Sequence, residues 1–148
     1  MELFFNHMKE QTKNSQYYPK YHLAPPYGHL NDPHGLCQIN GWYHIFYQWY
    51  PLGAVWGLKC WYHLKTRDFI NFIDYGAALW PDENMDCGGC WDGIAVKEKQ
   101  QWAIYYTGVN RENLQQLCRA NFDGEKNIWG KTVCIENDFT FSTRNFRD

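Results

Sequence analysis

Asp32 is the residue whose setting most suggests chemistry, because it lies in the stretch 21–35, a bend rich in proline. Pro25, Pro26 and Pro33 each remove a backbone donor and push the preceding residue toward extended backbone angles. A carboxylate whose direction is fixed in this way, among Tyr, His and Trp side chains, suits a reaction on a polar ligand. The alternative is an aspartate that only closes a turn.

A β-hairpin is predicted directly after this bend. Strand-like runs at 36–39 and 42–49 flank Asn40-Gly41, a pair typical of two-residue hairpin turns. Asp32 is therefore expected at the mouth of the first strand of a sheet. Further strands are expected at residues 58–64, 69–75, 93–96, 102–107, 114–122 and 132–135.

The predicted strands form two similar sets of four, which indicates two blades of a β-propeller. A glycine, a short strand, a turn and a Trp-led strand follow one another from Gly35 and again from Gly93. Asp92 precedes the second set as Asp32 precedes the first, and Asp148 ends the chain where a third set would begin. The expected fold is all-β, a partial propeller of about two blades plus the start of a third. Its acidic residues would converge at one end of a central channel.

Composition and charge exclude several classes of protein. The formal net charge is −2 and the 14 Lys and Arg are scattered, so no surface for nucleic acid or an anionic membrane is predicted. No run approaches the roughly 18 apolar residues of a membrane span. The polar lead-in, residues 1–20, lacks the apolar core of a secretory signal, so a cytoplasmic location is expected. Aromatic residues make up 19% of the chain, and the apolar faces and polar tips of Trp and Tyr suit sugar rings as well as packing between sheets.

Cysteine and histidine offer weaker alternatives. Cys87 and Cys90 have the spacing of a metal or redox pair, but no second pair exists and a strand is predicted where a redox motif would open a helix. Five of the six histidines fall in one stretch near Asp32, at positions 22, 29, 34, 44 and 63. No two of these histidines have the spacing of ligands on one helix, so no metal site is predicted.

Seven segments, in order along the chain, resemble the motifs of glycoside hydrolase family 32, the group of invertases and sucrose-6-phosphate hydrolases. The family's Trp-Met-Asn-Asp-Pro-Asn-Gly motif is similar to His-Leu-Asn-Asp-Pro-His-Gly at residues 29–35. The other matching segments are 21–26, 46–51, 55–57 with 61–63, 89–93, 105–108 and 146–148. The resemblance therefore covers the chain from about residue 21 to its last residue.

This resemblance implies a five-bladed β-propeller followed by a β-sandwich, with residues 21–148 as the incomplete N-terminal part of the catalytic propeller. It implies retaining hydrolysis of a β-fructofuranoside, with sucrose or sucrose 6-phosphate as the sugar partner and no cofactor. Asp32 would be the nucleophile that attacks the anomeric carbon, and Asp148 would stabilise the transition state as positive charge grows on the ring. The residues expected to bind the sugar are Asn31, Gln48, Trp56, Trp91, Asp92 and Arg147.

One catalytic group implied by the resemblance falls outside these motifs. Retaining hydrolysis needs a second carboxyl group, a general acid about 5 to 5.5 Å from the nucleophile. The resemblance places that glutamate downstream of Asp148, so the chain is expected to be a truncated form that is inactive alone. His34 replaces the motif's second asparagine, and Asp92 stands where the family has the first serine of Ser-Gly-Ser. The alternative is a pseudoenzyme fragment that binds fructosides without cleaving them.

Overall fold

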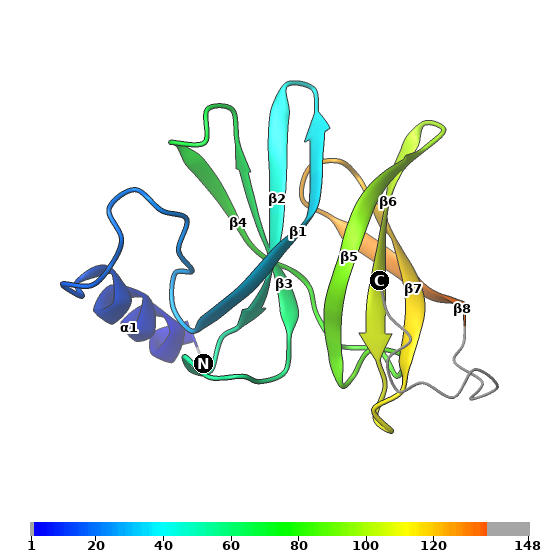
Figure 1. The fold of residues 1–148 in the computed structure, drawn as a ribbon, viewed down its shortest axis with the longest axis horizontal. Coiled ribbons are helices and arrows are strands. Elements are labelled where there is room, and N and C mark those ends of the chain that lie inside the picture. Colours follow the sequence, from blue (N-terminus) through cyan, green and yellow to red (C-terminus); the bar gives the residue numbers. More distant parts are fainter. Residues whose placement is uncertain (1, 136–148) are drawn as a thin grey trace.

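The computed structural model describes residues 2–135, in which one helix precedes eight β-strands (Figure 1). The elements are α1 Glu2–Lys13, β1 His29–Ile39, β2 Trp42–Tyr50, β3 Cys60–Thr66, β4 Phe72–Leu79, β5 Gly89–Glu98, β6 Gln101–Val109, β7 Gln115–Phe122 and β8 Ile128–Ile135. Over this described part of the chain, no helix has the length and apolar character needed to cross a membrane.

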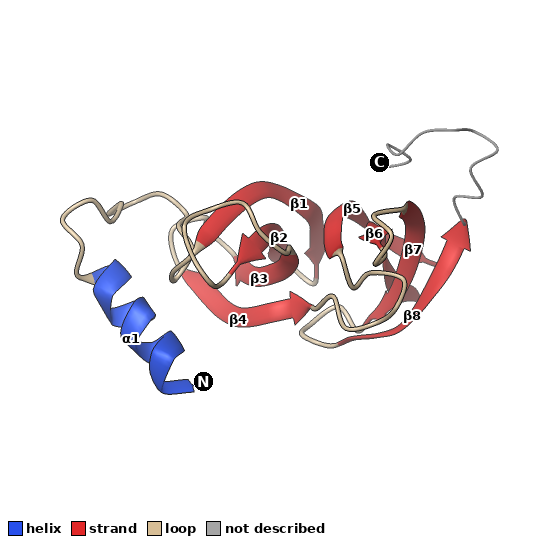
Figure 2. Cartoon of the chain, turned by 90° about the horizontal axis from the view of Figure 1, so that it is seen from below, coloured by secondary structure: helices blue, strands red, loops and turns tan. Residues whose placement is uncertain are grey.

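The strands form two antiparallel sheets of four, in the orders β1-β2-β3-β4 and β5-β6-β7-β8. We call them the first sheet and the second sheet. They lie side by side, with β1 next to β5, and β4 ends beside the second sheet (Figure 2). The two predicted sets of four strands are thus confirmed. The predicted start of a third set, including Arg147 and Asp148, lies outside the described residues.

The predicted hairpin is confirmed. β1 and β2 pair around Asn40 and Gly41, whose φ angles of 50° and 78° are the positive values that a type I′ turn requires. The predicted start of β4 at residue 69 was wrong, because Asp68 Oδ1 accepts hydrogen bonds from the backbone N–H groups of Ile70 and Asn71 and closes a turn there.

The main core lies between the two sheets. Phe46 and Trp61 from the first sheet meet Ile104, Tyr106 and Phe122 from the second, and all five side chains are fully buried. Burial of such large apolar and aromatic groups is the principal force that holds the sheets together. The relative position of β1 and β5, and of any residues on them, therefore depends on this core.

The opposite face of the first sheet carries a second cluster, which includes Tyr47, Trp49 and Tyr62. Helix α1 partly covers this face, with Phe5 stacked on Tyr27 at 5.6 Å between ring centroids. β2 and β3 are consequently buried on both faces along most of their length. The polar lead-in predicted for residues 1–20 is therefore mostly a helix that contributes apolar side chains to packing.

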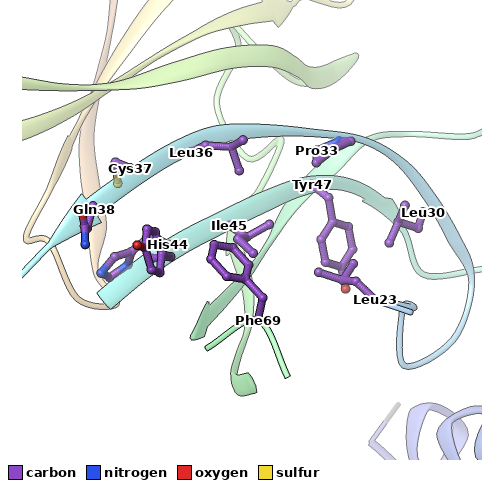
Figure 3. A pocket seen from close by; sticks show the side chains of 11 residues that line it. Leu23, Leu30, Pro33, Leu36, Cys37, Gln38, His44, Ile45, Tyr47 and Phe69 are labelled. Atoms are coloured by element: carbon purple, nitrogen blue, oxygen red, sulfur yellow. The ribbon is translucent and has the colours of Figure 1, made fainter. Parts of the chain in front are cut away.

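A mainly apolar hollow of about 630 Å³ also opens beside β1 and β2. Leu30, Pro33 and Tyr47 line it together with Leu23 and Ile45 (Figure 3). Asp32 is not among its lining residues, although Leu30 and Pro33 are close to Asp32 in sequence. The acidic residue expected to do chemistry is thus separate from this hollow.

Candidate functional site

Asp32 lies in a β-bulge of the edge strand β1. Leu30 pairs with Trp49. Pro33 pairs with Tyr47, so that β1 has one residue more than β2 between these two pairs. An edge strand tolerates Pro33 because the missing N–H has no partner strand to serve on its outer side. The expectation that Asp32 sits at the mouth of the strand was wrong: the strand starts earlier, at residue 29, and the bulge gives the carboxylate its position.

A second bulge interrupts β5 in the same way. Cys90 pairs with Gly108. Gly93 pairs with Tyr106, again leaving one extra residue on the first strand of the sheet. Asp92 occupies this bulge as Asp32 occupies the other. The sequence similarity between the two sets of strands therefore corresponds to a shared backbone feature.

A chain of hydrogen bonds connects the two bulges. Asn31 Nδ2 donates to Asp32 Oδ2 at 2.8 Å and to Gln48 Oε1 at 3.2 Å. Gln48 Nε2 donates to Asp92 Oδ1 at 2.6 Å. His34 Nδ1 lies 3.1 Å from the same Asp92 oxygen. The structure thus brings together four of the predicted site residues and adds His34, which the sequence marked only as a departure from the motif.

His34 is buried, and its imidazole ring packs against Trp61 at 4.0 Å between ring centroids. Burial lowers the pKa of His34, and the hydrogen bond and negative charge of Asp92 offset only part of that effect, with a smaller contribution from Asp32. Burial therefore favours the neutral form of His34. A neutral ring that donates to a carboxylate carries its proton on Nδ1.

The loop between β2 and β3 lies next to the start of β1, where the rings of Trp56 and His29 are 6.4 Å apart between centroids. Trp56, one of the predicted sugar-binding residues, is 68% exposed there. Lys59 Nζ lies 4.4 Å from the Trp56 ring centre and 2.7 Å from His29 Nδ1. Burial lowers the pKa of Lys59, while the negative charge of Asp32 opposes that shift. Sequence reasoning gave no role to Lys59, which lies outside the matched motifs, or to His29, which only begins the motif at residues 29–35.

The remaining predicted site residues are Trp91, Arg147 and Asp148. Trp91 is half-buried in the second bulge, and its carbonyl oxygen accepts a hydrogen bond from Trp61 Nε1 at 2.8 Å. This bond is one of several that join the two sheets. Arg147 and Asp148 lie outside the described residues, so their expected roles stay predictions.

Cysteine and histidine do not gather into one site. Cys90 is buried next to Asp86, and this burial raises the pKa of its thiol, which favours an inert side chain. His44 and His63 form a separate buried pair, with 3.0 Å between Nδ1 and Nε2. Across residues 2–135, no group of three or more His, Cys, Asp or Glu side chains is arranged to hold a metal ion.

This chain is similar in sequence and in structure to known proteins. Residues 22–148 match the glycosyl hydrolases family 32 N-terminal domain. Sucrose-6-phosphate hydrolase of Vibrio alginolyticus is 44% identical over an alignment of 135 residues, and the match covers 88% of this chain and 28% of that protein. The structure of sucrose-6-phosphate hydrolase from Lactobacillus gasseri is similar with a TM-score of 0.86 and 30% identity, over 92% of this chain and 29% of that one. The chain thus spans less than a third of these relatives.

A structure of a Bombyx mori β-fructofuranosidase variant in complex with sucrose is also similar, with a TM-score of 0.73 and 29% identity, over 88% of this chain and 28% of that one. These similarities confirm the expected all-β fold as part of a propeller, with two blades in the described residues. The chain therefore belongs to glycoside hydrolase family 32.

Proposed function

We propose that this chain forms the nucleophile-bearing part of a retaining β-fructofuranosidase that acts on sucrose or sucrose 6-phosphate. The observation that carries the proposal is the bulge of β1, which presents an exposed Asp32 whose Oδ2 is held by Asn31. A carboxylate that is both oriented and accessible meets the requirement for attack on an anomeric carbon.

In the proposed reaction, an Asp32 oxygen forms a bond to the anomeric carbon of the fructosyl unit while the bond to the leaving sugar oxygen breaks. Water then attacks the same carbon and frees Asp32, so that the configuration is retained. Asn31 holds the nucleophile in place through its hydrogen bond. Each of these steps depends on the direction of one carboxylate.

Gln48 is suited to bind the sugar at the same time. Its carboxamide spans the gap between Asn31 and Asp92, using one acceptor and one donor. A glutamine has two N–H donors and two acceptor lone pairs, so each end keeps hydrogen-bonding capacity beyond these two contacts. Gln48 is 3% exposed, so a sugar hydroxyl would reach it from the side of Asp32 and Asp92. We extend the proposal to Trp56 and Trp91 as apolar walls.

The leaving sugar oxygen needs a proton from a carboxylic acid, and the glutamates bound by cations are poor candidates. Hydrogen bonds from Arg119 lower the pKa of Glu98 to about 2. The hydrogen bond from Lys65 lowers the pKa of Glu125. A general acid needs the opposite shift. We therefore propose that the acid is supplied from outside residues 2–135, and that Asp148 and Arg147 complete the site.

Grafting tests this proposal. The matching part of the Vibrio alginolyticus enzyme is replaced by this chain, and release of fructose from sucrose and from sucrose 6-phosphate is measured. We expect activity in the graft, loss of activity with Asp32→Asn, and unchanged activity with Asp82→Asn, an exposed aspartate on the loop between β4 and β5. The isolated chain is expected to release no fructose.

Binding separates the two candidate functions. If the folded graft binds sucrose but does not cleave it, the chain acts as a fructoside-binding module. If it neither binds nor cleaves sucrose or its 6-phosphate, the proposed function is wrong. NMR titration of the isolated chain with fructose gives an independent measure of the same binding.

A further inference from the structure

The hydrogen bonds between the two bulges have a fixed direction. Asp92 Oδ1 accepts from both Gln48 Nε2, at 2.6 Å, and His34 Nδ1, at 3.1 Å. An ionised carboxylate can only accept hydrogen bonds. Asp92 therefore requires Gln48 to turn its NH₂ group toward the second sheet.

The orientation of Gln48 in turn fixes the orientation of Asn31. With its NH₂ group committed to Asp92, Gln48 presents Oε1 to Asn31. Asn31 must then present its own NH₂ group, whose second N–H reaches Asp32 Oδ2. Each carboxamide has one orientation that satisfies both neighbours, and the reversed orientation would place two donors or two acceptors face to face.

His34 lies at the opposite end of this hydrogen-bond chain from Asp32. Its side chain is 6% exposed and packs on Trp61, which limits its rotation. Its neutral form has one N–H, which the contact with Asp92 uses at Nδ1. Because His34 lies on β1 and Asp92 on β5, this contact also ties the second sheet to the strand that carries Asp32.

We propose that His34 and Asp92 are positioning residues that set the direction of the Asp32 carboxylate through Gln48 and Asn31. The catalytic meaning of this pair rests on the proposed function, but the coupling itself does not require sugar. Both members are residues at which the chain departs from the family motifs, and the structure shows them in contact. The two departures therefore compensate each other as one unit.

Heteronuclear NMR of the full chain without sugar tests the coupling. The signals measured are the carboxyl carbon of Asp32, the side-chain NH₂ of Asn31 and the ring nitrogens of His34. Asp92→Ser replaces an obligate acceptor by a hydroxyl that can donate or accept. We expect it to shift the Asp32 carboxyl signal, to speed hydrogen exchange at the Asn31 NH₂ about tenfold, and to reduce the Nδ1–H form of His34.

Matched variants separate positioning from general destabilisation. In a Gln48→Leu background, Asp92→Ser should leave the Asp32 signal unchanged, because Gln48→Leu already removes the hydrogen bonds that link Asp92 to Asn31. His34→Leu removes the donor and should reproduce the Asp92→Ser shift, whereas His34→Gln keeps an N–H donor and should restore much of the wild-type spectrum. Asp82→Asn, an exposed control, should change none of these signals.

Two results would overturn the proposed positioning role of His34 and Asp92. One is an Asp32 carboxyl signal that Asp92→Ser does not shift. The other is a shift of the same size when Gln48→Leu is already present. If Asp92→Ser does not fold, the His34→Leu and His34→Gln comparison decides in its place. Fructose titration of the wild-type chain is a separate arm. Failure to bind fructose there would count against the proposed function, while the sugar-free spectra would still decide the pair.

Discussion

The two bulges follow the same backbone course but present their aspartates differently. Asp32 is exposed and receives one hydrogen bond from its neighbour Asn31. Asp92 is half-buried and receives hydrogen bonds from Gln48 and His34 of the other sheet. The same backbone feature therefore presents an accessible carboxylate on the first sheet and a more enclosed, hydrogen-bonded carboxylate on the second.

The sheets also differ in how much of their surface is covered. β2 and β3 of the first sheet are buried on both faces, because the second sheet covers one face and α1 with its loop covers part of the other. β8 of the second sheet is largely exposed, with Trp129 at 46%. The edge strand β1, which carries Asp32, thus pairs with a strand that is buried on both faces.

The two aspartates give the largest expected contrast. In the grafted enzyme, Asp32→Asn should lower kcat about 10⁴-fold, because the nucleophile is lost. Asp92→Asn should lower kcat only about tenfold, because it removes the obligate acceptor and leaves the nucleophile in place. Steady-state kinetics on sucrose measure both. Equal losses would show that the two bulges do not have separate roles.

Phe46→Ala should cause the largest loss of stability, about 3–5 kcal/mol, because its fully buried ring packs between the sheets. Trp129→Ala on the exposed strand β8 should cost less than about 1 kcal/mol. Urea unfolding followed by circular dichroism measures both values. A small effect at Phe46 would mean that the sheets are held together by other contacts.

The residue that follows the aspartate differs between the two bulges: it is Pro33 after Asp32 and Gly93 after Asp92. A Cβ on Gly93 would lie 2.1 Å from the carbonyl oxygen of Tyr105, so Gly93→Ala should cost about 3 kcal/mol. The same place in the first bulge holds Pro33, which is exposed, and Pro33→Ala should change stability by less than about 1 kcal/mol. The same unfolding assay tests this difference, and similar losses for the two variants would contradict it.

Acid should weaken the first sheet through His63. Burial, then the charges of His44 and Lys65, lower the pKa of His63 from 6.5 to about 3. The unfolded chain takes up a proton near pH 6.5 and the folded chain does not, so stability is full above that pH and falls below it. We expect His63 to account for about 2 kcal/mol of the loss between pH 8 and pH 5, so that the loss is smaller in His63→Gln. An unchanged slope in that variant would assign the acid sensitivity to other groups.

The smallest effect is expected at the far end of the junction between the sheets. Lys65 and Tyr75 of the first sheet both contact Glu125 of the second, whose side chain is mostly exposed. Glu125→Gln should therefore cost less than about 1 kcal/mol. The His34→Leu variant, at the buried end, should cost more in the same assay. The reverse order would place the stronger polar link at the exposed end.

Local patterns predicted much of this architecture. The Asn40-Gly41 turn and the strand run that follows it are properties of neighbouring residues, and both were predicted correctly. The start of β1 was missed because Pro33 and Gly35 usually end strands, whereas bulges at an edge accommodate them. The bulges depend on pairing between strands, which no single run of residues reveals.

The candidate site was predictable only in part. Asn31 and Asp32 are adjacent, and the motif places them together. The contact of His34 with Asp92 joins residues 58 positions apart and depends on how the core docks the two sheets. Sequence alone marked both residues as unusual without indicating that they meet.

The extra residue in β1 also bears on how this chain can evolve. Removing one codon between those for Leu30 and Pro33 would leave both of these residues able to keep their partners on β2, because regular pairing needs one residue fewer there. The alternation of side chains on either side would be preserved, but the bulge that exposes the Asp32 carboxylate would be lost. Under the proposed function, such a deletion would silence the site in one step while preserving the sheet, and the reverse insertion would restore the reactive group.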